Sequence, residues 1–395
     1  MNCPCCQSSN SEIIRSTSPT VASDRKIYNN KSTFKICINC GFIYNSEGAR
    51  GAELEFYSEE YDLHSESTFS EFLVYGNTGP ATTQSDAILN FIKSNIRLAS
   101  RGRMLEVGAG KGLFLKRFLD EYSEWNCSAI EPSSNALKYF KEVLPEVNIH
   151  PGTFESSPFL DEKFDLVASS GVIEHVPAPL EFLKLLKKVT SKNGFLYLGF
   201  PNFDVKQDDF LIYDHLNQLN PTSVDQLYRQ AGLQLVGRDV SSSRIWQWDL
   251  LSPSSEIQEI SNLAYSQNKQ IALEANTYIN NSSESFQKFI DNIKVDKFTN
   301  NLVFGIGITA IYNIADYSKN TMIKPSAHEL GINYFIDDSP SLWGSKLLGA
   351  EIIGSEKIKN LIGTSQVFIS ANPCYHEKMV DKLCKSGIDM NNIFR

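Results

Sequence analysis

The 395-residue sequence lacks any long hydrophobic run and any excess of basic residues. No apolar stretch reaches the roughly 18 residues that suggest a membrane-spanning helix, so we expect no contact with a membrane. Lysine and arginine number 37 against 46 aspartates and glutamates, which gives a formal charge of −9. This balance disfavours a nucleic-acid-binding protein, which would need a basic surface. The first ten residues contain neither a basic nor an apolar segment, so we expect no secretory signal and a cytoplasmic location.

Cysteine is scarce beyond residue 40, because five of the eight cysteines lie in the first 40 residues. Without an export signal, this cluster indicates a metal site more than a disulfide framework. Cys3 and Cys6 form one C-x2-C pair, and Cys37 and Cys40 form a second pair. Two such pairs, joined by short hairpin strands, predict a zinc ribbon with a closed, structural four-thiolate site. A redox C-x-x-C pair is the alternative, and Cys5 is left as a spare thiol.

The length predicts two to three domains at roughly 150 residues each, and the 42% hydrophobic content indicates a globular protein. Composition and pattern divide the chain into four parts. These are a zinc-binding module with a lid at 1–75, an α/β domain at 76–250, a helical bridge at 251–300 and a smaller α/β unit at 301–395.

An acidic and aromatic stretch at about residues 48–79 joins the cysteine module to the α/β domain. It is either a solvated connector or a lid that presents Tyr57, Tyr61 or Tyr75 over an active site. Long connections without strong periodicity are often functional, so both interpretations remain open.

The most informative stretch is a predicted buried strand at 104–107, followed by the glycine turn GAGKG at 108–112 and a helix. Such a turn lets the backbone approach a ligand closely, but alone it fits a dinucleotide, a phosphate or S-adenosylmethionine (SAM). Glu106 would repel a pyrophosphate and suits a cationic amino-acid ligand. Glu131 follows the next predicted strand, at 127–130, where an acid can accept ribose hydroxyls.

The same alternation continues with a buried strand at 164–168, a helix at 179–190 and a strand at 195–200. In order, the motifs are ExGxGxG, an acid after strand two, FDLVxxxxVIEHV and NGxLxLxxPN. As a set they resemble the class I SAM-dependent methyltransferases over about residues 80–240. A Rossmann dehydrogenase is the alternative, because the glycine pattern is shared.

This resemblance implies a fold and a set of cofactor contacts. The fold would be α/β, with the Rossmann-like sheet of these enzymes beside the zinc ribbon and a second Rossmann-like unit. Glu106, Gly108 and Gly110 would line the methionine and ribose side, and Glu131 would take the ribose hydroxyls. Thr153, Phe154 and Glu155 would border the adenine, and Ser170 would lie near the sulfonium.

The C-terminal part repeats the strand–turn–helix pattern after a polar, helical stretch at 254–300. A strand at 302–304 leads into a G-x-G-x-x-A turn, and later strands and a helix predict a smaller parallel α/β unit. The turn matches a nucleotide-binding pattern, although Asp337 and Asp338 lie further along than the roughly 20 residues usual for a ribose ligand. Nucleotide binding and a degenerate unit used for packing or dimer contacts both remain open.

The three parts in this order resemble the SAM-dependent C-methyltransferases that act on nucleotide-linked deoxysugars. The resemblance implies methylation of the carbon α to a ketone, on a nucleoside-diphospho-4-keto-6-deoxysugar. It also implies a nucleotide-holding C-terminal unit and a zinc module that shapes the substrate cleft. Methylation of a sugar hydroxyl is the second interpretation, and a non-catalytic scaffold is the third.

Removal of the α proton calls for a histidine. His215 is the first candidate and His175 the second, with Asp214 to orient a histidine. Tyr213 and Tyr75 are candidate hydrogen-bond donors to the oxyanion. The sugar C-methyltransferases usually show a Tyr-His-Glu-His run here, whereas this chain has Ile-Tyr-Asp-His at 212–215. The final histidine is kept, aspartate replaces glutamate and the tyrosine is displaced by one position.

Overall fold

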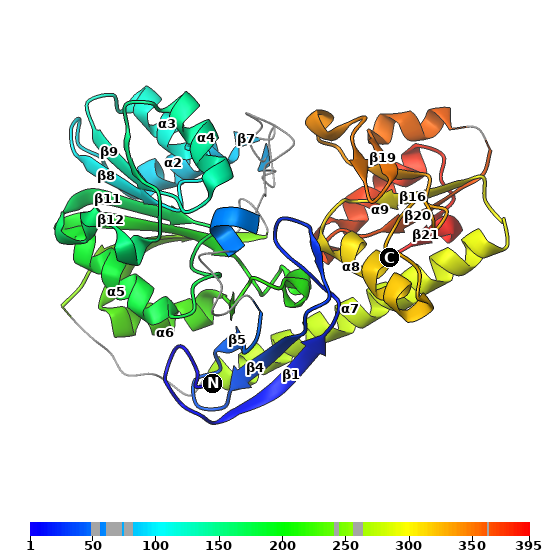
Figure 1. Cartoon of the computed structure of the whole chain (residues 1–395), viewed down its shortest axis with the longest axis horizontal. Helices are drawn as coiled ribbons and strands as arrows, with labels where there is room; N and C mark the ends of the chain where they lie inside the picture. The colour runs from blue at the N-terminus through cyan, green and yellow to red at the C-terminus, as the bar shows by residue number, and fades with distance from the viewer. Residues whose placement is uncertain (49–55, 61–72, 75–81, 241–244, 256–263, 362) are drawn as a thin grey trace. The chain divides into compact units, whose positions relative to one another are not determined.

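A computed structural model describes residues 1–48, 56–60, 73–74, 82–240, 245–255, 264–361 and 363–395 (Figure 1). None of the helices in these ranges is both long enough and apolar enough to cross a membrane. The chain forms two compact units. The first comprises Met1–Ile14, Thr33–Lys206 and Asp214–Gln270, and the second comprises Arg15–Ser32, Gln207–Tyr213 and Ile271–Arg395.

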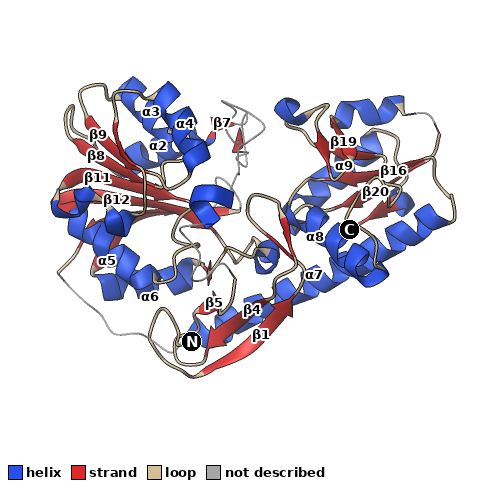
Figure 2. Cartoon of the chain, viewed as in Figure 1, coloured by secondary structure: helices blue, strands red, loops and turns tan. Residues whose placement is uncertain are grey.

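A seven-stranded sheet dominates the first unit, in the order β10-β9-β8-β11-β12-β15-β14 (Figure 2). The first five strands pair in parallel, and β15 and β14 add an antiparallel edge. The strands are β8 (Arg103–Val107), β9 (Asn126–Ile130), β10 (Asn148–His150), β11 (Phe164–Ser170), β12 (Thr190–Pro201), β14 (Leu233–Asp239) and β15 (Trp246–Pro253).

Helices cover both faces of this sheet, as Figure 1 shows. Side chains alternate along β8, so Met104 packs into one core with α2 and α3, while Leu105 packs into another with α5 and α6. The α/β fold expected for a class I methyltransferase is therefore confirmed. The helices are α2 (Gln84–Asn95), α3 (Leu113–Glu121), α4 (Ser134–Val143), α5 (Pro179–Val189) and α6 (Pro221–Ala231).

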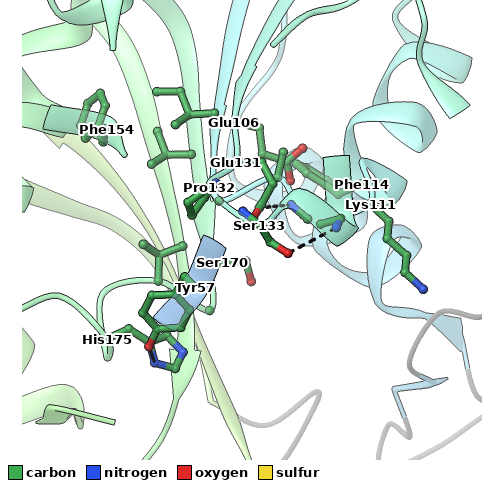
Figure 3. Close-up of a pocket in the computed structure, with 18 of the residues that line it drawn as sticks. Tyr57, Glu106, Lys111, Phe114, Glu131, Pro132, Ser133, Phe154, Ser170 and His175 are labelled. Carbon is green, nitrogen blue, oxygen red and sulfur yellow. Dashed lines mark hydrogen bonds between the residues drawn. The ribbon is translucent and has the colours of Figure 1, made fainter. Parts of the chain in front are cut away.

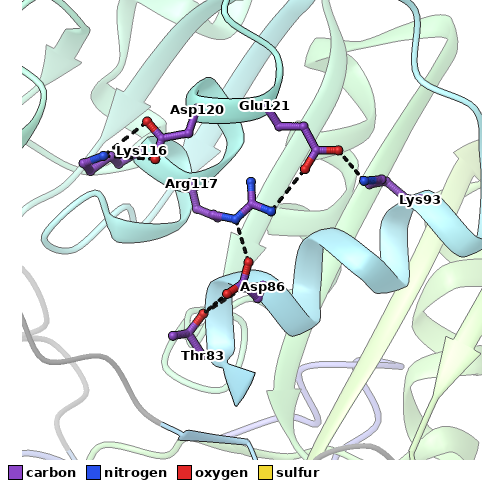
Figure 4. A network of polar contacts seen from close by, with 7 residues as sticks. All are labelled: Thr83, Asp86, Lys93, Lys116, Arg117, Asp120 and Glu121. Atoms are coloured by element: carbon purple, nitrogen blue, oxygen red, sulfur yellow. Dashed lines mark hydrogen bonds and ion pairs between the residues drawn. The ribbon is translucent and has the colours of Figure 1, made fainter. Parts of the chain in front are cut away.

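Ion pairs on the surface join α2 to α3, the helix that follows the glycine turn (Figure 4). Arg117 Nε lies 2.6 Å from Asp86 Oδ1, and Arg117 also pairs with Glu121 one turn along α3. Lys93 of α2 pairs with the same Glu121. Exposed pairs of this kind contribute little individually, and here they reinforce the packing of two helices that already share a core.

The cysteine module contributes to a smaller four-stranded sheet in the order β1-β4-β5-β13. Its last strand comes from much later in the chain and pairs antiparallel with β5. Cys3 and Cys6 precede β1, Cys37 ends β4, and Cys40 lies in the turn between β4 and β5. The strands are β1 (Ser11–Thr17), β4 (Ser32–Cys37), β5 (Ile43–Asn45) and β13 (Asn217–Gln218).

The second unit contains a six-stranded sheet in the order β18-β19-β17-β16-β20-β21, in which β16 pairs in parallel with β17 and β20. The predicted helical stretch contains α7 (Ala264–Lys294), whose residues from Ile271 onward belong to this unit. The other main elements are β16 (Asn300–Phe304), α8 (Ile308–Thr321), β17 (Tyr334–Ile336), β18 (Lys346–Leu347), β19 (Ala350–Ile353), β20 (Ser365–Ile369), α9 (His376–Lys385) and β21 (Ile393–Phe394).

Candidate active site

A cavity of about 410 Å³ opens beside the carboxyl ends of β8, β9 and β11 (Figure 3). Open α/β sheets bind their ligands at this edge, because the loops that follow the strands converge there. The volume falls in the range of small-molecule and cofactor sites. Its wall includes Tyr57, Gln84, Glu106, Gly108, Gly110, Lys111, Phe114, Glu131, Tyr139, Thr153, Phe154, Glu155, Ser170, Val172, His175 and Trp246.

The glycine turn forms the floor of this cavity. Gly108 has a φ of +77°, and a Cβ atom there would lie 2.3 Å from Cγ2 of Val172. The backbone N–H groups of Gly108 and Ala109 both donate to the carbonyl of Ile130, at 2.9 and 3.0 Å. These bonds hold the turn against the end of β9. A side chain at position 108 would therefore displace the loop that follows β11.

Glu131 is held rigidly at the cavity wall by two backbone donors. Gly110 N–H donates to Oε2 and Ser133 N–H donates to Oε1, each at 2.7 Å (Figure 3). The carboxyl group is buried, which raises its pKa, while the two donors oppose that rise. A carboxylate held in this way can still accept ligand hydroxyls with its remaining lone pairs.

Glu106 is buried at the end of β8, and its Oε2 atom has no hydrogen-bond partner among the described residues. Burial, and then the nearby charge of Glu131, raise the pKa of Glu106 well above its ordinary value. A buried acceptor without a partner is costly unless a ligand satisfies it. The ammonium and sulfonium groups of SAM are cations of the kind that a carboxylate in this wall stabilises, so these residues fit that cofactor.

The remaining predicted cofactor residues also line the cavity, and further residues join them. Thr153, Phe154 and Ser170 all lie in the wall. Lys111 and Tyr139 were not predicted; the Lys111 ammonium lies 4.5 Å from the centre of the Tyr139 ring. Trp246, at the start of β15, also lines the cavity and was missed, because its strand follows the motif region and carries no recognisable pattern. Lys111 lies inside the glycine motif, which was the signal available for it.

A polar cluster around His175 forms another part of the wall. Tyr57 Oη lies 2.8 Å from His175 Nδ1, and the carbonyl oxygen of Asp214 lies 3.0 Å from the same nitrogen. Tyr57 also donates to Asp214 Oδ2 at 3.4 Å. When Nδ1 carries the proton and donates to the carbonyl, the lone pair of the neutral imidazole is on Nε2. In that tautomer, Nε2 is the atom of His175 that can accept a proton.

His215 packs directly behind His175. The two rings meet edge to face, with centroids 4.7 Å apart and an angle of 82°. His215 is 4% exposed and Asp214 is fully buried. Of the two candidate bases, the described cavity wall includes His175 and not His215. Glu174 completes the group, with Oε1 4.0 Å from His175 Nε2.

The other predicted tyrosines are not part of the described cavity wall. Tyr75, together with Tyr61, falls outside the described residues. Tyr213 belongs to the second compact unit, although it directly precedes Asp214 in sequence. Its ring stacks on Tyr28 with centroids 5.3 Å apart, and its hydroxyl accepts a hydrogen bond from the Asn30 side chain at 3.0 Å.

Asp337 and Asp338, the acids considered for a nucleotide in the C-terminal unit, already form hydrogen bonds or an ion pair within the protein. Asp338 pairs with Lys382 at 2.7 Å and accepts a hydrogen bond from the Ser355 hydroxyl. Asp337 accepts a hydrogen bond from Ser339 N–H. A ribose would have to compete with these contacts.

The four predicted zinc ligands come together in the first unit. The sulfur atoms of Cys3 and Cys40 lie 3.6 Å apart, and those of Cys6 and Cys37 lie 3.5 Å apart. All four lie within 4.8 Å of one another. Four thiolates in such a group are the donor set that structural zinc prefers, so the residues fit that metal. Cys5 is outside this group.

Residues of α6 and α7 pack against the two cysteine-containing segments. Gln226 of α6 donates to the carbonyl of Cys40 at 3.0 Å, and Gln230, one turn later, donates to Cys5 Sγ at 3.3 Å. Gly41 has a φ of +71°, and a Cβ atom there would lie 2.5 Å from the backbone of Ala264 in α7. The second cysteine pair therefore requires glycine at position 41.

Comparison with known families decides the class of the central domain. The family described as "Methyltransferase domain" matches residues 105–198, which extend from β8 through most of β12. The chain contains a SAM-dependent methyltransferase domain. The glycine turn, Glu106 and Glu131 all lie within the matched residues.

Curated relatives match parts of the chain at low identity. The biotin biosynthesis bifunctional protein BioHC of Teredinibacter turnerae is 23% identical over 206 residues, covering 48% of this chain and 36% of that protein. The malonyl-[acyl-carrier protein] O-methyltransferase of Chlorobium luteolum is 31% identical over 111 residues, covering 27% of this chain and 42% of that protein. The matches thus cover less than half the length of either relative.

Solved structures include similar folds. The glycopeptide N-methyltransferase MtfA covers 43% of this chain and 90% of its own, with 16% identity and a TM-score of 0.35. A SAM-dependent methyltransferase from Clostridium acetobutylicum covers 43% of this chain and 91% of its own, with 11% identity and a TM-score of 0.37.

Proposed function

We propose that this methyltransferase transfers the methyl group of SAM to the carbon α to a keto group of a nucleotide-linked deoxysugar. One observation carries the proposal: Tyr57 and His175 lie in the same cavity wall as Glu106 and Glu131. An acceptor bound beside the cofactor would therefore meet an imidazole and a phenol. Those groups can remove a proton and stabilise an oxyanion.

The proposed reaction has two bond changes at the acceptor. The C–H bond α to the ketone breaks, its proton passes to the cluster around His175, and its electron pair forms the enolate. The enolate carbon then attacks the methyl carbon of SAM, and the S–CH₃ bond breaks to leave S-adenosylhomocysteine.

We also propose that the second unit by itself binds a nucleoside. There Gly305, with a φ of +100°, precedes the start of α8. Asp208 accepts a hydrogen bond from the hydroxyl of Thr309, in the first turn of this helix, at 3.2 Å. Because a carboxylate already lies near this helix end, phosphate groups are disfavoured there, and the nucleoside is the better candidate for this unit.

We also propose that the four cysteines hold one structural zinc ion. The closed four-thiolate donor set supports this assignment, and such a site has no open position for catalysis. Zinc would then stabilise the small sheet, which is otherwise built from short strands.

Methyl transfer to an oxygen atom is the second candidate. The 31% identity to a malonyl-[acyl-carrier protein] O-methyltransferase favours it. A hydroxyl or carboxyl acceptor needs only removal or absence of its proton and correct positioning beside SAM. The same cavity offers a base, His175, and a position beside the cofactor for such an acceptor.

One experiment separates the two candidates. The full chain is incubated in heavy water with methyl-labelled SAM and a panel of nucleotide-linked sugars, with and without a 4-keto group, and products are examined by mass spectrometry. We expect deuterium at the α carbon and a labelled methyl group on carbon, with keto sugars only. Label on oxygen, or transfer to sugars without a keto group, would contradict C-methylation.

A further inference from the structure

Outside the cysteine cluster, a second group of metal-binding side chains lies in the first unit. Glu174, His175 and His215 each offer one ligand atom, and these atoms all lie within 4.8 Å of one another. Glu174 is 2% exposed and His215 is 4% exposed. His175 is 11% exposed at its side chain and lies in the cavity wall. The group is therefore buried on one side and accessible from the cofactor cavity on the other.

We propose that Glu174, His175 and His215 form a second metal site, which binds a divalent transition-metal ion such as Zn²⁺. Two imidazoles and one carboxylate are the donor set of several catalytic zinc sites and of three-ligand sites for other first-row metals. Three protein ligands leave a coordination position for water or for an oxygen of the acceptor. This property distinguishes the group from the closed cysteine site.

The hydrogen bonds of His175 match those of a metal-bound histidine. Such a histidine usually donates its other ring N–H to a carbonyl or carboxylate, which sets the tautomer and orients the ring. Here Nδ1 lies 3.0 Å from the carbonyl oxygen of Asp214 and 2.8 Å from Tyr57 Oη. The remaining nitrogen, Nε2, lies 4.0 Å from Glu174 Oε1. The contacts on Nδ1 thus direct Nε2 toward the carboxylate that would share the ion.

The two chain segments that supply the ligands are fastened to each other. The N–H groups of Leu216 and Asn217 donate to the carbonyl of Glu174, at 2.7 and 3.0 Å. The Asn217 side chain donates to the carbonyls of Ile173 and Val176, at 3.0 and 2.8 Å. Four hydrogen bonds therefore set the distance between the pair at 174–175 and His215 before any ion binds, which lowers the cost of assembling the site.

The spacing is close to what an ion needs. Metal–ligand bonds of about 2.0–2.2 Å imply ligand atoms roughly 3.3–3.6 Å apart in a tetrahedral site. The Nε2–Oε1 distance of 4.0 Å and the outer limit of 4.8 Å exceed this by roughly 0.4–1.5 Å. Binding of the ion therefore requires the buried Glu174 and His215 side chains to move closer together.

The role of the ion deepens the proposed function and rests on it. With Nε2 of His175 bound to the ion, a hydroxide ligand of that ion would take the α proton in place of the imidazole, and the ion would carry the negative charge that develops on the acceptor oxygen. Occupancy of the site does not depend on that role, because it can be measured without an acceptor.

The test counts metal in the full chain, produced without a polyhistidine tag. Protein is equilibrated with Zn²⁺, separated from loosely held ions by gel filtration and assayed by elemental analysis. We expect about two equivalents in the wild-type protein, one in the cysteine cluster and one in this group. His215→Ala and Glu174→Gln should each bind about one equivalent.

A matched control and a fold check make the result decisive. His328→Ala removes an exposed histidine of the second unit and should keep two equivalents. SAM affinity, measured by calorimetry, should stay within about threefold in all variants, since neither Glu174 nor His215 is a described part of the cavity wall.

Two results would overturn the second metal site. One is a wild-type protein with a single equivalent that is lost on mutation of Cys6; the other is a second equivalent that persists in both His215→Ala and Glu174→Gln. A wild-type protein with one equivalent that still methylates a keto sugar would overturn the metal site alone. The proposed function would then stand, with an imidazole as the free base.

Discussion

The phenolic oxygen of Tyr57 lies 2.8 Å from Nδ1 of His175, across 118 positions of sequence. The tyrosine comes from a short π-helix, Phe56–Glu60, in the connection between the cysteine module and the central domain. The histidine follows β11. Their contact brings this connection to the edge of the cofactor cavity, so at least this part of it is more than a solvated linker.

Replacement of Tyr57 by phenylalanine tests this contact. The change removes the hydroxyl that touches Nδ1 of His175 and Oδ2 of Asp214, and leaves the ring in place. We expect kcat to fall roughly 10- to 100-fold, because the imidazole loses part of its orientation. The SAM dissociation constant should change little. Tyr122→Phe, which alters a ring stacked on Phe118, serves as the control and should retain full activity.

Glu131→Gln tests the ribose contact. The amide keeps the shape of the side chain but loses the charge and one acceptor, so a bond from Gly110 or Ser133 must weaken. We expect the SAM dissociation constant, measured by calorimetry, to rise roughly 10- to 100-fold, as is typical for charge-assisted hydrogen bonds. Glu124→Gln, an exposed residue paired with Arg101, should bind SAM as the wild type does. Unchanged affinity in Glu131→Gln would remove this residue from the ribose site.

The raised pKa of Glu106 predicts that SAM binding depends on pH. Burial and the charge of Glu131 favour the protonated acid in the cofactor-free protein, whereas the cationic cofactor favours the carboxylate. SAM affinity should therefore increase with pH through this raised pKa, with release of a proton on binding. Calorimetry in buffers of different ionisation enthalpy measures that proton, and Glu106→Gln should abolish its release while binding SAM more weakly.

The raised pKa of Glu106 also makes the stability of the cofactor-free protein depend on pH. Stability should fall as pH rises, whereas SAM affinity should increase. The folded state holds the Glu106 proton more tightly than the unfolded chain does. The free energy of unfolding should therefore decrease as pH rises from the ordinary carboxyl pKa through the raised one. Glu106→Gln should lessen this decrease. An identical pH profile in the wild type and the variant would contradict the assignment.

The cysteine-rich N-terminus offers a matched pair of variants. Cys6 belongs to the four-sulfur group, whereas Cys5 lies outside it and accepts a hydrogen bond from Gln230. Cys6→Ser should lose about one equivalent of zinc and lower the melting temperature, because the metal and the fold of the small sheet are coupled. Cys5→Ser should keep its zinc. If both variants lose the metal equally, Cys5 is also a ligand.

Local patterns were sufficient for much of the central domain. The glycine turn, Glu106 and Glu131 lie at the ends of adjacent strands, and a parallel sheet brings such ends to one edge whatever the rest of the chain does. Strands predicted at 104–107 and 127–130 appear as β8 and β9 with shifts of one residue at most. The four-cysteine group could be predicted from the sequence equally well, because the spacing of metal-binding cysteines is visible directly in the sequence.

What the sequence by itself determined is therefore the α/β order, the position of Glu106 and Glu131 at strand ends, and the cysteine pairs, since each follows from residues close together in the chain or from strand ends. Only the tertiary structure decided how the histidines are used. It brought Tyr57, Glu174 and Asp214 to His175, and packed His215 behind His175. It also stacked Tyr213 on Tyr28, although Tyr213 is the neighbour of Asp214 in sequence. These contacts join segments that are far apart in sequence and share no repeating pattern. Only long-range packing in the folded chain therefore determines which residues meet.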